Sequence, residues 1–197
     1  MEGYYTELAR IHMTKLSKLV VFPKGVYVDE HNSIHLIMPK RLSLFEFVHN
    51  VTKSTTSFSV PSYTKLVIMT QLARTMDTFH SFGHTAHGHL TSHNVFVEIP
   101  EDPEKVDNLK VQVSEIEMTE FKKYANMFYT YRNASVWSAP EVLRQQKKLL
   151  EPTKPMDVYS FGLIMWELYH ESIPFDDDLQ ACSEFVLNRD ERPKIQS

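Results

Sequence analysis

Glycine and cysteine are scarce in this chain of 197 residues, and each scarcity excludes a class of structure. The five glycines stand at positions 3, 25, 83, 88 and 162, and they form no G-x-G-x-x-G loop of the kind that wraps nucleotide phosphates. The single cysteine, Cys182, excludes an internal disulfide and is typical of a protein from a reducing compartment.

Positive charge and long apolar runs are also scarce. A net charge of −4 and an isoelectric point near 6.2 provide no basic surface for nucleic acid or for an anionic membrane. No apolar run approaches the roughly 18 residues that span a bilayer, and the polar residues after Met1 do not resemble a secretory leader. We therefore expect a cytoplasmic protein that inserts into no membrane. Because 42% of the residues are hydrophobic, the chain can build a folded core of domain size.

Two stretches predict the main helices of that core. The first carries apolar residues every three or four positions, which predicts one stripe that packs inward. The residues of this stripe are Leu66, Met69, Ala73, Met76 and Phe79. The second stretch, 158–168, is apolar on almost every side, so we expect it to be the buried axis of the fold.

The first forty residues predict a smaller unit. Residues 5–19 carry apolar side chains at helical spacing, and residues 28–30 and 33–38 predict two strands joined through Asn32.

Two later segments predict loops. Residues 52–62 are rich in Ser and Thr, and residues 99–108 contain two prolines among acidic residues. The acidic segment is either a solvated surface insertion or a docking loop for another protein.

The stretch 87–97 reads HGHLTSHNVFV, in which a series of polar residues leads into an apolar strand. Its frame is that of the H-R-D-L-x-x-x-N loop, and the defined positions are His87, Gly88, His89, Leu90 and Asn94. In that loop the Asp accepts the proton of a substrate hydroxyl, and the Asn holds a magnesium ion. The spacing is kept here, but His89 stands in place of the proton-accepting Asp.

Three further landmarks follow in order. Residues 111–117 predict a strand that ends in Glu-Ile-Glu where D-F-G is expected, residues 138–143 contain an intact A-P-E, and residues 157–168 match a D-V-x-S-F-G helix. With these four landmarks the chain resembles a protein kinase. The phrases at 43–49, 173–175 and 192–195 are similar to those of the tyrosine-kinase-like group.

The resemblance implies an α+β, protein-kinase-like fold, made mainly of the helical C-lobe with a partial small lobe. Residues 1–40 would form the small-lobe helix, strands and hinge, and residues 41–197 a C-lobe truncated before its last helices. The glycine-rich loop and the lysine-bearing strand would lie upstream of Met1. We expect either that the sequence belongs to something longer, or that another chain buries the exposed apolar faces.

The resemblance also implies structural roles. Glu7 is the candidate for the glutamate that pairs with the small-lobe lysine. His87 would pack below the active site, and Asp157 would bond to the backbone of the catalytic loop. Glu141, from A-P-E, would lack its family-type arginine partner, which lies between the missing helices.

Several positions that carry the chemistry of kinases are altered. Thr91 stands where serine/threonine kinases have a Lys on the transferred phosphate, and Gly88 stands where an Arg reads a phosphorylated activation loop. Glu115 keeps a carboxylate at the magnesium position but shifts its oxygens, which magnesium tolerates badly. Glu117 adds negative charge where D-F-G has Gly. We therefore expect no catalytic residue, and the degenerate positions are His89, Thr91, Asn94, Glu115 and Glu117.

These changes favour a pseudokinase, a catalytically inactive kinase-like domain that acts as a protein-interaction scaffold or an allosteric partner in signalling. Its expected partners are other proteins and not nucleic acid. As an alternative, a longer form is a weakly active or ATP-binding protein kinase, in which Asn94 and Glu115 help to hold ATP and magnesium. A third hypothesis is an incomplete gene product without a function of its own.

Two other clusters bear on function. Four histidines fall within ten residues of the sequence, at His84, His87, His89 and His93. Their spacing matches no usual zinc pattern, so we predict no metal. The segment that resembles an activation loop contains candidate phosphoacceptors, which either accept phosphate from another kinase or pack on the lobe. These residues are Tyr124, Tyr129, Thr130, Tyr131 and Ser135.

Overall fold

The computed structural model of the chain describes residues 18–32, 34–51, 59–82, 86–114, 134–144 and 150–195. In these residues the strands are β1 (Gly25–Val28), β2 (Ile34–Ile37), β3 (Leu42–Ser43), β4 (Val95–Glu98) and β5 (Lys110–Val113). The helices are α2 (Leu44–Glu46), α3 (Ser62–Phe82), α5 (Pro140–Arg144), α6 (Lys154–His170) and α7 (Leu179–Ser183). Turns of 3₁₀ or π type lie at Phe47–Val51, Pro103–Asn108, Pro174–Asp177 and Glu184–Asn188.

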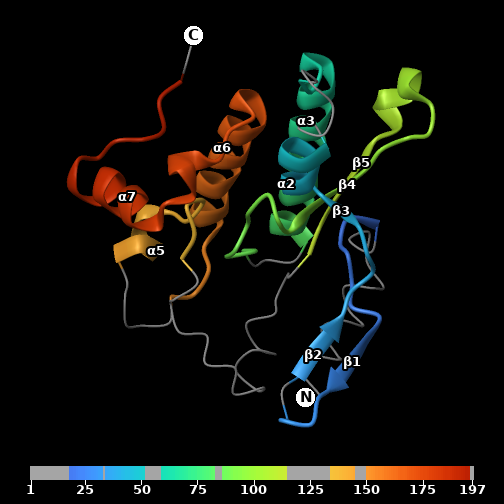
Figure 1. Cartoon of the computed structure of the whole chain (residues 1–197), viewed down its shortest axis with the longest axis horizontal. Helices are drawn as coiled ribbons and strands as arrows, with labels where there is room; N and C mark the ends of the chain where they lie inside the picture. Colours follow the sequence, from blue (N-terminus) through green and yellow to red (C-terminus); the bar gives the residue numbers. More distant parts are fainter. Residues whose placement is uncertain are drawn as a thin grey trace.

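Helices α3 and α6 form the centre of the helical part, and α5 and α7 lie beyond α6 (Figure 1). The antiparallel strands β3, β4 and β5 form a sheet in that order, and β5 packs against α3. The β1–β2 hairpin projects away from the helices at the end of the molecule near the N-terminus (Figure 1). The architecture is α+β, with the helices carrying most of the core.

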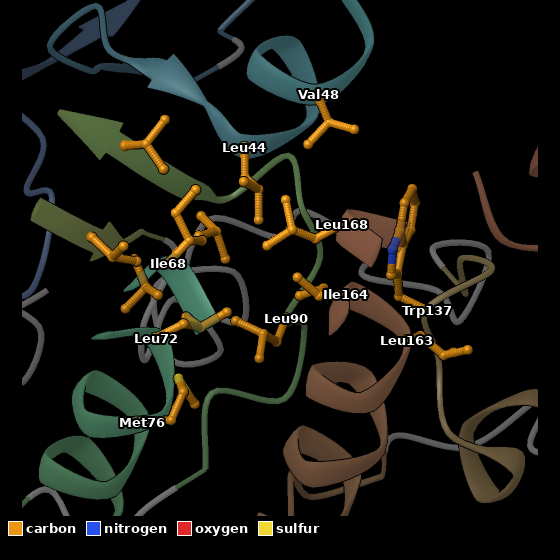
Figure 2. Packing of buried hydrophobic residues seen from close by; sticks show 14 of the residues in the cluster. Leu44, Val48, Ile68, Leu72, Met76, Leu90, Trp137, Leu163, Ile164 and Leu168 are labelled. Atoms are coloured by element: carbon orange, nitrogen blue, oxygen red, sulfur yellow. The ribbon is translucent and has the colours of Figure 1, made fainter. Parts of the chain in front are cut away.

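The core gathers between α3, α6 and the three-stranded sheet (Figure 2). Leu90, which is 1% exposed, reaches into it from the loop after α3 and lies near Leu72 and Ile164. Full burial of one such leucine contributes about 1.5–3 kcal/mol to folding. The loop from 86 to 94 is therefore attached to the core by one of its own side chains.

The short helix α2 begins where β3 ends because Ser43 caps it. The Ser43 hydroxyl accepts a hydrogen bond from the Glu46 backbone N–H at 3.1 Å, and the Glu46 carboxylate accepts one from the Ser43 backbone N–H at 3.0 Å. This capping box satisfies two backbone donors that the first helical turn leaves unpaired. It turns the chain sharply from the sheet into the helical part.

The hairpin near the N-terminus confirms the predicted pair of strands but corrects one boundary. Asn32 has a φ of 61° and lies in the turn, as predicted, whereas β1 covers Gly25–Val28 instead of 28–30. Val26 and Tyr27 are both exposed, so neither face of β1 is buried. Without one buried face, the alternating pattern that defines a strand's limits is weak.

The predicted helix at 5–19 falls almost wholly outside the described residues. The residues that follow the predicted helix bind to strand β5, because the Val21 backbone N–H donates to the carbonyl of Val113 at 2.8 Å. Val20 and Val21 are each 5% exposed. The start of the described chain is thus tied to β5.

The predicted stripe on α3 is right at Met69, Met76 and Phe79, which pack in or against the core, and wrong at Leu66 and Ala73, which are exposed. Met76 and Phe79 are buried, but Leu66 is 58% exposed. Ile68 and Leu72 face the core instead, at 0% and 1%. Two overlapping apolar rows occur in this helix, and packing against α6 and β5 decides which row turns inward.

Helix α6 is buried on one face only, which corrects the expectation of a helix surrounded by protein. Its buried residues are Met156, Asp157, Ser160, Leu163, Ile164, Glu167 and Leu168. On the opposite face Val158 is 63% exposed and Met165 is 37% exposed. Because the buried face carries Asp157 and Glu167, it is more polar than the outer face, which a hydrophobicity pattern cannot anticipate.

The acidic segment between β4 and β5 contains the 3₁₀ turn Pro103–Asn108 and lies at the tip of that hairpin (Figure 1). Here Lys105 pairs with Asp102 at 3.2 Å, so part of the negative charge is neutralised locally. None of the helices in the described part of the chain combines the length and apolar character needed to cross a bilayer.

Candidate functional site

The loop from 86 to 94 connects α3 to β4, and Asp157 at the start of α6 holds its backbone. The carboxylate oxygens of Asp157 accept hydrogen bonds from the backbone N–H groups of His87 and Gly88, at 2.7 and 2.8 Å. Asp157 is 2% exposed. Buried backbone donors require such acceptors, and the two bonds are those predicted from the sequence for Asp157.

A third donor to Asp157 comes from α3. The Nε2 atom of His80 lies 2.7 Å from the carboxylate, so α3, α6 and the loop meet at one buried charge. Sequence reasoning missed His80. Its position four residues after Met76, at the edge of the buried stripe and in the last turn of the helix, was the available signal.

His87 ties the loop to the end of β5. Its Nε2 atom lies 2.7 Å from the carbonyl oxygen of Ser114 and donates to it, while its Nδ1 accepts from the backbone N–H of His89 at 3.3 Å. The imidazole is 4% exposed. Position 115 follows directly, but Glu115 and Glu117 lie outside the described residues, as does Glu7.

Asn94 serves the loop with both atoms of its amide. Its Oδ1 accepts from the backbone N–H of Thr91 at 2.9 Å, and its Nδ2 donates to the carbonyl of His89. The side chain is 5% exposed. These bonds close the loop on itself, and the oxygen that would ligate magnesium already has a hydrogen-bond donor.

Two further altered positions lie in the described part of the loop. Thr91 is buried at 5% exposure, and His89 is half-buried. Within the described part of the chain, no three His, Cys, Asp or Glu side chains gather as a metal site would require. His84, one of the four clustered histidines, lies outside that part.

A second buried carboxylate lies beneath the loop. Glu167 of α6 is 1% exposed and accepts three hydrogen bonds. The donors are His49 Nε2 at 2.9 Å, Ser92 Oγ at 2.8 Å and Trp137 Nε1 at 2.7 Å. Ser92 belongs to the loop and Trp137 precedes the A-P-E residues, so Glu167 joins the two segments. Sequence reasoning did not single out any member of this cluster.

Aromatic rings continue this contact to the surface. The His93 ring stacks on Phe45 with centroids 4.0 Å apart and meets the edge of Trp137 at 5.5 Å. His93 is exposed, whereas Trp137 is 2% exposed. The loop therefore presents an imidazole on a rigid aromatic support.

The C-terminal segment covers one side of α6. The Trp166 indole N–H donates to the carbonyl of Lys194 at 3.0 Å, and the Arg192 guanidinium lies 5.5 Å from the Tyr159 ring centroid. Burial raises the pKa of Tyr159, and Arg192 partly opposes that rise. In the described residues, Glu141 of α5 forms no ion pair.

Comparison with known proteins agrees with this geometry. Residues 4–194 match the family described as protein tyrosine and serine/threonine kinase. The chain belongs to the protein kinase family. The serine/threonine-protein kinase/receptor R826 of Acanthamoeba polyphaga mimivirus is 31% identical over 165 residues, which are 80% of this chain and 9% of that protein. The serine/threonine/tyrosine-protein kinase HT1 of Arabidopsis thaliana is 28% identical over 143 residues, 70% of this chain and 32% of that protein.

The fold is shared with a solved structure. A cryo-electron microscopy structure of the AtMLKL3 tetramer covers 97% of this chain, with a TM-score of 0.61 and 22% identity. At that identity the likeness shows the fold alone, and it confirms the predicted kinase-like fold. This chain spans 33% of that protein and a similar share or less of the two relatives.

Proposed function

We propose that this kinase-family chain is a pseudokinase of the tyrosine-kinase-like group, which acts by binding other proteins as a scaffold or allosteric partner. The observation that supports it is the use of the catalytic-loop side chains. Asp157 and Asn94 bond to the backbone of the loop, and His87 bonds both to the N–H of His89 in the loop and to the carbonyl of Ser114 after β5. None of these bonds requires substrate, whereas position 89 has lost the carboxylate that would accept a proton.

The balance of effects also favours binding over catalysis. Losing a positioned base costs about 10²–10⁴-fold in rate, which by itself leaves a slow enzyme. Phosphoryl transfer further depends on neutralising the charge of the phosphates. Thr91 and Glu117 supply no positive charge, and Glu117 adds a negative one. The residue types at these two positions thus disfavour bound nucleotide.

Exposed apolar side chains support protein partners. Val158 and Tyr169, on the outer face of α6, are 63% and 60% exposed. Where exposed apolar side chains join into one patch, the patch commonly marks a site of protein interaction. The single cysteine and the acidic net charge support a cytoplasmic location.

A nucleotide titration tests the proposal. The melting temperature of the purified chain should stay within 1 °C when ATP and magnesium are added to millimolar concentration, because a ligand that binds only the native state raises it. A phosphotransfer assay on a generic protein substrate should give no signal above the Glu115→Ala variant. Saturable stabilisation, together with metal-dependent phosphotransfer that Glu115→Ala abolishes, would refute the proposal.

The alternative is a longer protein that binds ATP or retains weak kinase activity. The names of the two relatives support it, since both names describe protein kinases and both proteins are much longer than this chain. The same titration on a longer form distinguishes the two functions. Stabilisation by ATP there, but not in the 197-residue chain, would favour this alternative.

A further inference from the structure

One face of the β1–β2 hairpin is built from aliphatic residues alone. The register pairs Val26 with Leu36 and Val28 with Ile34, and residues that pair across two antiparallel strands share a face of the sheet. Val26 and Val28 are 45% and 52% exposed. The hairpin projects away from the described helices (Figure 1), so these helices leave both valines open to water.

A hairpin of two strands is only marginally stable by itself. Independent stability needs three or more strands with an apolar face, or a helix packed against the pair. β1 and β2 form a sheet of two strands, and within the described residues neither of them pairs with a third strand. The outer edge of each strand is therefore a place where another strand can add.

Neither strand carries the features that usually prevent such pairing. Natural edge strands are blocked by lysine, by proline or by a β-bulge. β1 reads Gly-Val-Tyr-Val, β2 reads Ile-His-Leu-Ile, and their register is uninterrupted. Edges of this composition favour strand addition, which is one of the recurring ways in which proteins bind an extended segment.

The charges at the two ends of β1 select both the partner and its direction. Lys24 precedes the strand and Glu30 follows it, and both residues are exposed. The Glu30 carboxylate lies 3.9 Å from the exposed ring of His31, a pairing that water weakens. A second copy of β1 that runs antiparallel brings Lys24 near Glu30 of the other copy at both ends of the pair, whereas a parallel copy would place like charges side by side. The strand is thus complementary to itself in the antiparallel direction.

The alternation of side chains along β1 restricts the register of that pair. In a twofold-symmetric antiparallel pair both aliphatic faces lie on the same side, so opposite residues must belong to the same face. When Tyr27 lies opposite its own copy, Val26 lies opposite Val28 of the second copy, and Lys24 and Glu30 meet at the ends. The sheet then has four strands in the order β2-β1-β1-β2, and one aliphatic face runs across both copies, as a stable sheet requires.

We propose that the outer edge of β1 is a self-association site, at which a second copy of this chain adds its own β1 antiparallel to form a four-stranded sheet. The site goes beyond the proposed function and does not depend on it, because its main-chain and charge contacts involve no residue of the loop from 86 to 94 and no nucleotide. An active kinase with this hairpin would associate in the same way.

Sedimentation equilibrium of the whole chain over a range of concentrations tests the site. The parent should pass from monomer to dimer as its concentration rises. In Lys24→Glu both ends of the strand pair carry like charges, so the dissociation constant should rise by about tenfold, and Glu30→Lys should raise it by a similar factor. The variant with both substitutions restores the pairs in reverse order and should return to within about threefold of the parent.

Lys154→Glu is the matched control, because it makes the same change of net charge at an exposed residue of α6. Its dissociation constant should stay within about twofold of the parent value. A parent that remains monomeric up to about millimolar concentration would overturn the proposal and leave the edge to a strand of another protein. A double variant that associates no better than the single ones, or a control that is weakened as much as Lys24→Glu, would overturn it as well.

Cysteine cross-linking tests the register. Tyr27→Cys places two thiols directly opposite each other, with Cβ atoms about 4.5–5.5 Å apart, which a disulfide can bridge with little movement. Val28→Cys shifts the two thiols apart by about 6.6 Å along the strands, which is too far. Under mild oxidation Tyr27→Cys should therefore give about five times more covalent dimer than Val28→Cys, while Cys182, which is buried, is common to both variants. Equal yields, or a greater yield for Val28→Cys, would overturn the proposed pairing.

These results are separable from the nucleotide titration. A chain that stays monomeric and is not stabilised by ATP would refute the self-association site and leave the proposed function intact. A dimer that ATP stabilises and that transfers phosphate would support the site and refute the proposed function.

Discussion

Replacing Asp157 by Asn is the most direct test of how the catalytic loop is held. Both carboxylate oxygens accept backbone N–H groups, from His87 at 2.7 Å and from Gly88 at 2.8 Å. Asn has one oxygen and one NH₂ group. In either orientation, the NH₂ group faces one of the two backbone N–H groups, so two donors oppose each other.

The expected cost follows from these contacts. One hydrogen bond to a charged acceptor is lost, worth about 1.5–3 kcal/mol, and one buried backbone donor is left unsatisfied, at about 1–3 kcal/mol. The contact with His80 also becomes neutral. Because the terms overlap, we expect the free energy of unfolding to fall by about 3–5 kcal/mol, which is the range for breaking a buried charged network.

Urea denaturation, followed by circular dichroism, measures this difference. Asp178→Asn is the matched control, because there only Oδ1 accepts, from the backbone N–H groups of Gln180 and Ala181 at the start of α7. Asn is as good as Asp at that position, so the control should lie within about 0.5 kcal/mol of the parent. If Asp157→Asn costs as little as the control, the carboxylate does not hold both N–H groups and the argument fails.

Three further predictions concern other buried groups. Trp137→Phe should lower the free energy of unfolding in urea by about 1.5–3 kcal/mol, because it removes a donor from the buried Glu167 carboxylate. Trp166→Phe is the control and should lower it by less than about 1 kcal/mol, because it loses only a surface bond to a carbonyl. Equal losses in the two variants would contradict the cluster around Glu167. Burial raises the pKa of Cys182 to about 11, although Arg192 opposes the rise. This thiol, the only one in the sequence, should therefore react slowly with a thiol reagent at pH 8 in the folded protein and quickly in urea. Fast labelling of the folded protein would show that the thiol is accessible. Burial opposes ionisation of Glu171, but hydrogen bonds from Lys65, Ser59 and the Val60 N–H outweigh it and lower the pKa of the folded carboxyl below 4.5. The unfolded chain then binds the proton more tightly, so this contribution to stability is present above about pH 4.5 and is lost as the pH falls below it. In Glu171→Gln, the free energy of unfolding should therefore decrease less steeply as the pH falls below about 4.5. An unchanged decrease would refute the lowered pKa of Glu171.

Much of the candidate site could be predicted from short segments. The positions of His87, Asn94 and Asp157 follow from motif spacing. In the structure, Asn94 bonds to the backbone of its own loop, His87 bonds to Ser114 at the end of β5, and Asp157 bonds to the loop from α6. Local spacing explains Asn94, whose backbone partners Thr91 and His89 lie three and five positions away. The bonds of His87 and Asp157 span 27 and 70 positions, and the family resemblance, not local spacing, indicated those two residues. Glu7, Glu115 and Glu117 lie outside the described residues, so their predicted roles stay predictions.

The polar clusters could not be predicted in the same way. His80 and His49 look like ordinary helical residues, and their partners lie 77 and 118 positions away. Hydrophobic periodicity also failed to choose between the two apolar rows of α3, because both rows have helical spacing.

The amino-acid order alone determined the family, the order of the landmarks and the loss of the catalytic Asp, since each of these is a matter of residue identity at fixed local intervals. The tertiary structure decided which buried charges hold the loop. Asp157 and Glu167 stand ten residues apart on one face of α6, and each gathers donors from segments that are distant in the chain. A buried carboxylate must find donors wherever the packing brings them, so these partners are defined only when α3, α6 and the loop come together.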